Sequence, residues 1–174
     1  KGYFVQPYDD SPLDRESVGE TVYLDLINRA SKYLYIFTPY LILDDFMRTA
    51  LCNAAKRGVD VRIVTPGIPD KKMVFRLTRS NYAPLMKSGV KIYEYTPGFI
   101  HAKSMVCDDE AAVVGTINLD YRSLYLHFEN AVYFSHCDAV AAVKQDGEDV
   151  FAVSKRMTIE DTRQTFIGKL VDSV

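Results

Sequence analysis

The sequence has no long hydrophobic run, few cysteines and no excess of basic residues. No apolar stretch approaches the roughly 18 residues that a membrane-spanning helix needs, and no signal peptide is recognisable. The three cysteines, Cys52, Cys107 and Cys137, form no CxxC pair and no cluster with histidine. We therefore expect neither a disulfide framework nor a zinc site. We expect the protein to reside in a reducing compartment. A net charge of −2 disfavours a dedicated nucleic-acid binder, which is usually basic.

What is present is the composition of one globular domain. The 174 residues are 48% hydrophobic and 25% charged, which is enough for a sizeable core. We interpret residues 1–16, rich in Pro and Asp, as a linker or arm, and residues 17–153 as the folded domain. Residues 154–174 are a C-terminal tail with a candidate short helix capped by Thr158. Because the chain begins at Lys1 rather than Met, we expect a piece of a longer protein.

Helical and extended patterns alternate along the chain. Helical spacing covers residues 17–31, 44–58, 70–88, 119–126 and 137–152. Extended runs cover residues 33–39, 59–66, 90–95 and 130–134, and a hairpin spans residues 100–118. Asp44 is the expected N-cap of the second helix, Gly58 its stop, and Pro84 should kink or divide the third. This order predicts an α/β sandwich with a mixed, mostly parallel sheet and an antiparallel part.

The hairpin carries four polar side chains at an unusual spacing. Its sequence is IHAKSMVCDDEAAVVGTIN, residues 100–118. Side chains two apart on a strand point to the same face, so His101 and Lys103 share one face, as do Thr116 and Asn118. A turn centred between residues 109 and 110 puts His101 opposite Asn118 and Lys103 opposite Thr116, with Cβ atoms roughly 4.5–5.5 Å apart. A slip of one residue would break this set, and Asp-Glu is a weak turn signal.

One cation, two neutral hydrogen-bonding groups and a histidine together suit a phosphate anion. Lys103 and Asn118 can hold phosphoryl oxygens and stabilise the charge that develops there. His101 can act as nucleophile or as general acid and base. A helix that begins near Leu119 would add backbone N–H donors. Spacing alone leaves open that these are polar residues on a solvated hairpin face.

The hairpin also carries a known signature. The pattern HxKx4Dx6G(S/T)xN of the phospholipase D superfamily is matched at every position, by His101, Lys103, Asp108, Gly115, Thr116 and Asn118. The resemblance implies an α/β/α sandwich with helices on both faces and a covalent phosphohistidine intermediate, with no metal or other cofactor. It implies His101 as the nucleophile or its acid/base counterpart, and Lys103, Thr116 and Asn118 as phosphate ligands. We interpret Asp108 as structural, holding the turn or a neighbouring cation.

The surrounding segments are similar to the C-terminal half of bacterial cardiolipin synthases. They are VQPYDDSPLD, AAKRGVDVRIVTPGIPDKK, GVKIYEYTPGFIHAKS and NLDYRSLYLHFEN. That family joins two phosphatidylglycerol molecules into cardiolipin and glycerol, with N-terminal membrane segments and two copies of the motif. This chain has one motif and no span, so the resemblance implies a soluble half of an enzyme of the bacterial cell membrane. The implied partners are the other motif-bearing half, phosphatidylglycerol and the anionic membrane surface.

Two other functions stay open on the sequence. The first is a single-motif phosphodiesterase or nuclease-like member that works as a homodimer. The second is a lipid-binding module without chemistry of its own.

Residues outside the motif are weaker candidates. A nucleophilic His needs its far nitrogen held by a partner, and we expect Glu129, which matches the Glu downstream of the motif in this superfamily, to hydrogen-bond His101. His127 and His136 lack a motif context, and we expect surface or structural roles for them.

A basic run follows the Pro-rich loop at residues 66–69. In it, Lys72, Arg76 and Arg79 are spaced to share one face of a helix, just after Lys71. These residues either form a solvated face of the helix or contact anionic lipid headgroups. Tyr121 and Arg122, just past Asn118, are further candidates for substrate contact.

Overall fold

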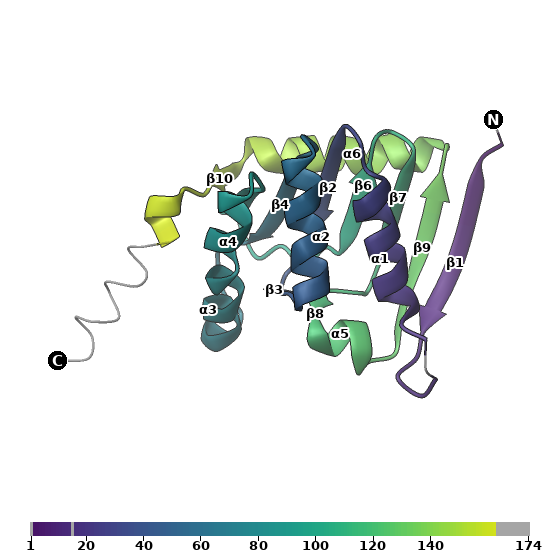
Figure 1. The fold of residues 1–174 in the computed structure, drawn as a ribbon, viewed down its shortest axis with the longest axis horizontal. Helices are drawn as coiled ribbons and strands as arrows, with labels where there is room; N and C mark the ends of the chain where they lie inside the picture. The colour runs from purple at the N-terminus through teal and green to yellow at the C-terminus, as the bar shows by residue number, and fades with distance from the viewer. Residues whose placement is uncertain (1, 15, 163–174) are drawn as a thin grey trace.

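The fold is an α/β/α sandwich around one eight-stranded sheet (Figure 1). The computed structural model describes residues 2–14 and 16–162. In spatial order the strands of this sheet are β1 (Phe4–Asp10), β9 (Glu129–Ser135), β7 (Ala111–Gly115), β6 (Ser104–Cys107), β2 (Tyr33–Phe37), β4 (Asp60–Pro66), β5 (Lys91–Tyr95) and β10 (Ser154–Arg156). The helices are α1 (Val18–Arg29), α2 (Asp45–Lys56), α3 (Lys72–Ser80), α4 (Tyr82–Lys87), α5 (Tyr121–Tyr125) and α6 (Asp138–Ala152).

The sheet is mixed, as predicted, but it is not mostly parallel. Among the described strands of this eight-stranded sheet, only the pairs β2–β4 and β4–β5 run parallel, and the other neighbours are antiparallel. The reason is local connectivity, because parallel pairs need a helical crossover whereas a tight turn joins β6 to β7. The expected parallel character therefore holds only for the part of the sheet where α2, α3 and α4 connect the strands.

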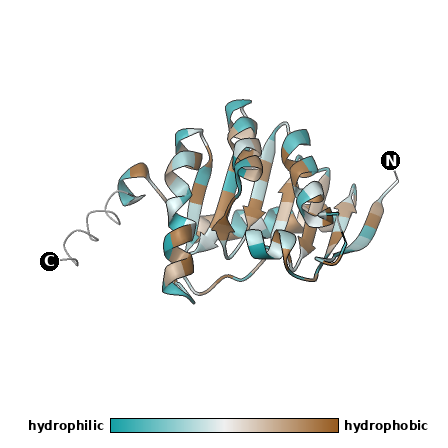
Figure 2. Cartoon of the chain, turned by 60° about the horizontal axis from the view of Figure 1, so that its bottom comes forward, coloured by the Kyte–Doolittle hydropathy of each residue, from teal (hydrophilic) through white to brown (hydrophobic). Residues whose placement is uncertain are grey.

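Helices cover both faces of the sheet, as the resemblance implied. Figure 1 shows α1, α2 and α4 in front of the strands and α6 behind them. On the front face Leu26, Leu51 and Ile63 are completely buried, and on the rear face Val106 and Phe151 belong to a second core cluster. The hydropathy colouring shows the apolar strands enclosed between these layers (Figure 2).

Both ends of the chain contribute strands that the sequence did not predict. Residues 4–10, expected to be an arm, form the edge strand β1 and pair with β9. Residues 154–156, expected to belong to the tail, form β10 and pair with β5. Residues 159–162 are helical, and Thr158 Oγ1 accepts a hydrogen bond from Asp161 N at 3.2 Å, as expected of a cap. The rest of the predicted tail helix, residues 163–174, lies outside the described residues.

The expected helix signals are found at most helix ends. Asp44 caps α2 by accepting a hydrogen bond from Met47 N at 2.7 Å. Gly58 and Gly89 follow α2 and α4 with φ of 96° and 105°, a left-handed conformation that favours glycine. The helix predicted over 70–88 is divided, but at Asn81 rather than at Pro84, which lies inside the first turn of α4. None of the helices in residues 2–14 and 16–162 has the length and apolar character needed to cross a bilayer.

A second, two-stranded sheet lies at the lower end of the molecule in Figure 1. It pairs β3 (Leu41–Ile42) with β8 (Leu119–Asp120) in parallel. Leu119 N also donates to Thr38 Oγ1 at 3.0 Å. This pairing ties the segment after β2 to the segment after the motif, and so positions the candidate site.

Candidate active site

The β6–β7 hairpin is paired one residue away from the predicted register. Ser104 lies opposite Val114 and Cys107 opposite Ala111, so the turn has three residues, 108–110. The predicted pairs His101–Asn118 and Lys103–Thr116 are therefore wrong. Beyond the strand the ladder continues with a bond from Gly115 N to Lys103 O at 3.1 Å. The turn differs because Asp108 and Asp109 both adopt left-handed φ, 57° and 59°, which the sequence pattern did not indicate.

His101 and Lys103 lie in the loop just before β6 rather than on a strand. The His101 ring is exposed and stacks on Phe99, with centroids 5.6 Å apart. The ammonium of Lys103 donates to the carbonyl of His101 at 2.7 Å. Partial burial and the neighbouring Lys103 lower the pKa of His101, against the opposing effect of Asp70. The imidazole is thus biased towards the neutral form, which is the form that can attack phosphorus.

Thr116 and Glu129 bind each other across the end of β7. The Thr116 hydroxyl donates to the Glu129 carboxylate and accepts from Asn130 N at 3.0 Å. The Glu129 side chain is only 9% exposed, and its second oxygen lies 3.6 Å from Nδ1 of His127. The hydrogen bond that we expected between Glu129 and His101 is not formed, because the carboxylate faces Thr116 and His127 instead. His127 is exposed, as expected, but it also contacts this carboxylate.

Lys103 and Glu129 also influence each other electrostatically. Partial burial lowers the pKa of Lys103, while the negative charges of Glu129 and Asp120 oppose that shift. The motif lysine is therefore partly dehydrated and lies within the electrostatic influence of two carboxylates.

Asn118 is held by α5. Its Nδ2 donates to the hydroxyl of Ser123 at 2.9 Å, and its Oδ1 is buried without a hydrogen-bond partner. The expectation that the helix near Leu119 offers free N–H donors to an anion is wrong. The carboxylate of Asp120 accepts from Arg122 N and Ser123 N, so those donors are already used.

The other two motif residues are tightly enclosed by backbone. A Cβ built on Gly115 would lie 2.4 Å from both Asn130 O and Ala131 Cβ, so only glycine fits between β7 and β9. Asp108 binds neither its own turn nor a cation within the described chain. Its carboxylate accepts four hydrogen bonds from the segment that leads into β2.

A pocket of about 340 Å³ opens between α3 and α5, beside the motif; we call it the α3–α5 pocket. Its polar lining is Lys71, Asn118, Asp120, Arg122 and His127. Its apolar walls are Tyr40, Ile42, Val74 and Tyr121. The pocket thus takes Asn118 from the motif and both candidates that follow it, Tyr121 and Arg122. Sequence reasoning missed Tyr40 and His127 as lining residues, since they belong to distant segments that the β3–β8 pairing brings together.

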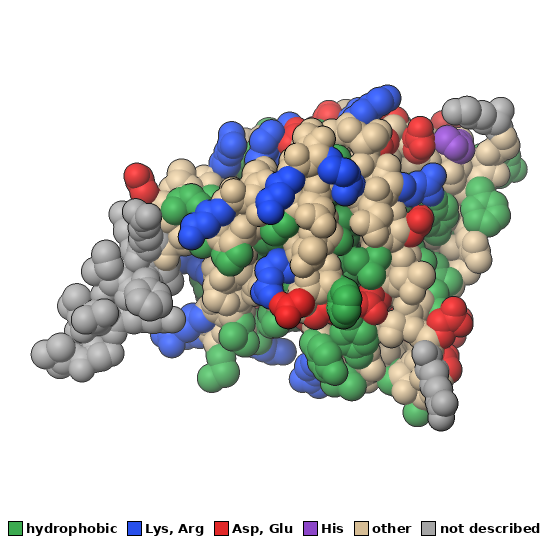
Figure 3. Space-filling view, in the orientation of Figure 1, with side chains coloured by type: hydrophobic (Ala, Val, Ile, Leu, Met, Phe, Trp, Pro, Cys, Tyr) green, Lys and Arg blue, Asp and Glu red, His purple; other side chains and the backbone are tan. Residues whose placement is uncertain are grey.

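The basic residues of α3 divide into two kinds. Lys72 and Arg76 are exposed and make no ion pair within the described part of the chain. Arg79 instead forms a bidentate pair with the buried Glu94, at 2.7 and 2.6 Å. Arg79 is therefore not available as the headgroup contact that its spacing suggested. In Figure 3 basic and hydrophobic side chains lie together at the lower end of the molecule, over α3 and next to α5. No group of three or more potential metal ligands occurs among residues 2–14 and 16–162.

Known proteins resemble this chain in sequence and in fold. The profile of the family described as "Cardiolipin synthase, PLD-like domain" matches residues 23–150. An uncharacterized protein of Streptococcus mutans is 57% identical over 155 residues, which are 89% of this chain and 34% of that protein. A cardiolipin synthase of Alkalihalophilus pseudofirmus is 40% identical over 142 residues, 82% of this chain and 28% of that enzyme. The chain thus spans about a third of the length of these relatives.

A solved structure shows the same fold. Nuc of Salmonella typhimurium, a phospholipase D family member, superposes with a TM-score of 0.76 at 19% identity and covers 90% of this chain and 99% of its own. The family match extends over most of the described domain and contains the complete motif from His101 to Asn118. This chain therefore belongs to the family of phospholipase D-like domains found in cardiolipin synthases.

Proposed function

We propose that the chain is the C-terminal, motif-bearing half of a phosphatidyltransferase that makes cardiolipin from two phosphatidylglycerol molecules and releases glycerol. The family membership and the 40% identity to a cardiolipin synthase support this. The observation that carries it is the cluster at the end of β7. There Thr116 of the motif binds a nearly buried carboxylate, Glu129, whose charge also acts on Lys103.

In the first step His101 attacks the phosphorus of one phosphatidylglycerol. A nitrogen–phosphorus bond forms, the bond from phosphorus to the glycerol headgroup breaks, and the glycerol oxygen takes a proton from a general acid. Lys103 and Asn118 bind the phosphoryl oxygens and stabilise the charge that develops on them. Thr116 joins them when its hydroxyl turns from the Glu129 carboxylate, to which it donates in this structure, towards the phosphate. The lowered pKa of His101 keeps the imidazole unprotonated for this attack.

In the second step a hydroxyl of the second phosphatidylglycerol attacks the same phosphorus. Its proton passes to the group that served as acid, the bond to His101 breaks, and cardiolipin is released. The acid is the motif histidine of the other half, since this chain supplies one HxK histidine. If the other half is a second domain of the same protein, the phosphatidyltransferase is favoured. If it is a second copy of this chain, the homodimeric alternative is favoured.

A chimaera tests the proposal. The aligned segment of the Alkalihalophilus pseudofirmus enzyme is replaced by this chain, and cardiolipin formation from phosphatidylglycerol is measured in mixed micelles. We expect the chimaera to be active and its His101→Asn variant to lose at least ~10³-fold in turnover. Lys87→Gln, an exposed change in α4, is the matched control and should keep full activity. A well-expressed chimaera in which His101→Asn remains fully active would reject the assignment.

A further inference from the structure

The α3–α5 pocket carries positive charge that carboxylates do not neutralise. The ammonium of Lys71 lies 6.0 Å from the centroid of the Tyr40 ring, and neither Lys71 nor Arg122 has an ion-pair partner in the described part of the chain. Several other guanidinium groups are paired, as in the bond of 2.6 Å from Arg62 to Asp60. An anion entering the pocket would therefore meet two cations with no carboxylate partner to displace.

Asp120 is the one acid in the described lining of this pocket. Its carboxylate accepts hydrogen bonds from Arg122 N at 2.9 Å and from Ser123 N at 3.1 Å, and the residue is buried. This carboxylate thus caps α5 and forms no ion pair with Lys71 or Arg122 within the described residues, so both side chains remain free for a ligand.

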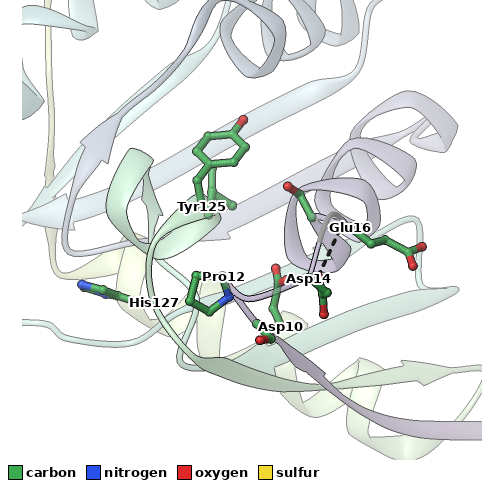
Figure 4. A pocket seen from close by; sticks show the side chains of 9 residues that line it. Asp10, Pro12, Asp14, Glu16, Tyr125 and His127 are labelled. Carbon is green, nitrogen blue, oxygen red and sulfur yellow. Dashed lines mark hydrogen bonds between the residues drawn. The ribbon is translucent and has the colours of Figure 1, made fainter.

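The neighbouring pocket shows the opposite charge. It holds about 150 Å³ and is lined by Asp10, Asp14 and Glu16 (Figure 4). His127 lines both pockets, and in Figure 4 its ring extends away from the carboxylates of Asp10 and Asp14. The two pockets therefore differ in the ligand that they can take, and only the α3–α5 pocket suits an anion.

We propose that the α3–α5 pocket binds the phosphate of a second organophosphate, the acceptor lipid, next to the phosphate held by the motif. This rests on the proposed function. Lys71 and Arg122 bind the phosphate oxygens, while Tyr40, Val74 and Tyr121 contact the carbon atoms of the headgroup. The volume of about 340 Å³ lies within the usual range of small-molecule sites. Asn118 belongs to both sites, so the donor and acceptor phosphates would lie side by side.

Nuclear magnetic resonance titration of the isotope-labelled 174-residue chain tests this. The ligands are inorganic phosphate, glycerol 3-phosphate and a short-chain phosphatidylglycerol below its micelle concentration. We expect chemical-shift changes at Lys71 and Arg122 with all three ligands. At this pocket the lipid should bind at least tenfold more tightly than inorganic phosphate, because its carbon atoms are buried against the apolar walls. Equal affinities for the three ligands would overturn the acceptor-lipid assignment and leave a site for free phosphate.

Variants distinguish this site from the motif. In Lys71→Gln/Arg122→Gln, binding at the pocket should weaken at least tenfold while shifts around Lys103 persist. In Lys103→Gln, binding at the motif should weaken while the shifts at the pocket persist. Lys56→Gln/Lys87→Gln removes two exposed cations that do not line the pocket, and this control should change neither. If the pocket variant binds normally while Lys103→Gln abolishes all binding, the second site is refuted and the proposed function stands. If Lys103→Gln changes nothing while the pocket variant loses binding, the motif assignment fails instead.

Discussion

The carboxylate of Asp108 binds Ser31 twice, through the backbone N–H at 2.7 Å and through the hydroxyl at 2.8 Å. The same carboxylate accepts from Lys32 N at 2.8 Å and from Tyr33 N at 2.9 Å. These residues connect α1 to β2, and β2 lies beside β6 in the sheet. The aspartate of the motif therefore fastens the β6–β7 turn to the neighbouring strand, away from the phosphate site.

Replacing Asp108 with Asn should destabilise the fold. Asn keeps the shape and tolerates the left-handed φ of this position, but it loses the charge that four donors share. We expect the free energy of unfolding to fall by about 1.5–3 kcal/mol at neutral pH, the range for hydrogen bonds to a charged group. Chemical denaturation measures this, and the exposed Glu110→Gln is the control.

The same residue predicts a dependence of stability on pH. Burial acts to raise the pKa of Asp108, but the bonds from Tyr33, Lys32 and Ser31 outweigh it and lower the pKa. A carboxyl with a lowered folded-state pKa stabilises fully above its unfolded value, about 3.9, and loses this contribution as the pH falls through the folded value. The difference in unfolding free energy between wild type and Asp108→Asn should thus shrink below about pH 4. A difference that stays constant down to pH 2 would contradict the role of the charge.

Arg79→Gln should destabilise the protein without a direct effect on lipid binding. Glu94 is 4% exposed, and without Arg79 its charge is left with the hydroxyl of Tyr82 at 3.1 Å as its remaining partner. Removing one partner of a buried pair typically costs about 3–5 kcal/mol, and we expect the lower end because Arg79 is partly exposed. Arg76→Gln, on the same helix and exposed, should change stability by less than about 0.5 kcal/mol. Equal effects of the two changes in denaturation would be unexpected.

Gly115→Ala should disturb the motif. The added methyl group would lie 2.4 Å from Asn130 O, so β7 and β9 must separate where Thr116 meets Glu129. Overpacking of this kind costs about 1–3 kcal/mol. The control is Gly147→Ala in α6, where the nearest atoms are at ordinary contact distance, 3.4 Å or more. That change should stabilise by about 0.5–1 kcal/mol, because alanine favours a helix interior, and thermal unfolding of both variants gives the comparison.

Glu129→Gln should slow catalysis in the chimaera more than it affects the fold. The neutral amide can still accept from Thr116, so the structure is kept, but the charge that faces Lys103 and His127 is lost. We expect turnover to fall by about 10–100-fold with little change in KM, the range known for residues that orient the ligands of a metal ion, a comparable supporting role. Unchanged turnover at an unchanged melting temperature would exclude the role.

Local patterns were sufficient for most helices and central strands. Asp44 and Gly58 bound α2 as predicted, and the apolar runs gave β2, β4 and β5, because caps and periodicity are encoded in neighbouring residues. Edge strand β1 was missed because its sequence, FVQPYDD, contains Pro7 and is mostly exposed. Proline is uncommon in strands, so this pattern is typical of irregular structure. The two-residue strands β3 and β8 are too short to show any period.

The pairing of the candidate site could not be predicted from the sequence. The spacing of the motif gave His101, Lys103, Thr116 and Asn118 as candidates, yet their register depended on the left-handed conformation of Asp108 and Asp109 in the turn. The partner of Arg79 could not be predicted either, since spacing gives the face of a helix and not the buried carboxylate that approaches it. Contacts between distant segments, such as those that form the α3–α5 pocket, lie beyond periodicity for the same reason.

The last prediction concerns the isolated chain, which should fold but make essentially no cardiolipin. The proposed mechanism uses two histidines, and among those of this chain only His101 has the HxK context. Loss of the general acid alone costs roughly 10²–10⁴-fold, and loss of the other half of the phosphate clamp lowers the rate further. The measurement is cardiolipin formation in mixed micelles by the purified chain, together with its mass in solution. Activity that appears only in a dimeric fraction would favour two copies pairing their sites with twofold symmetry. Robust turnover by a demonstrated monomer would show that one motif suffices, and the half-enzyme interpretation would have to be abandoned.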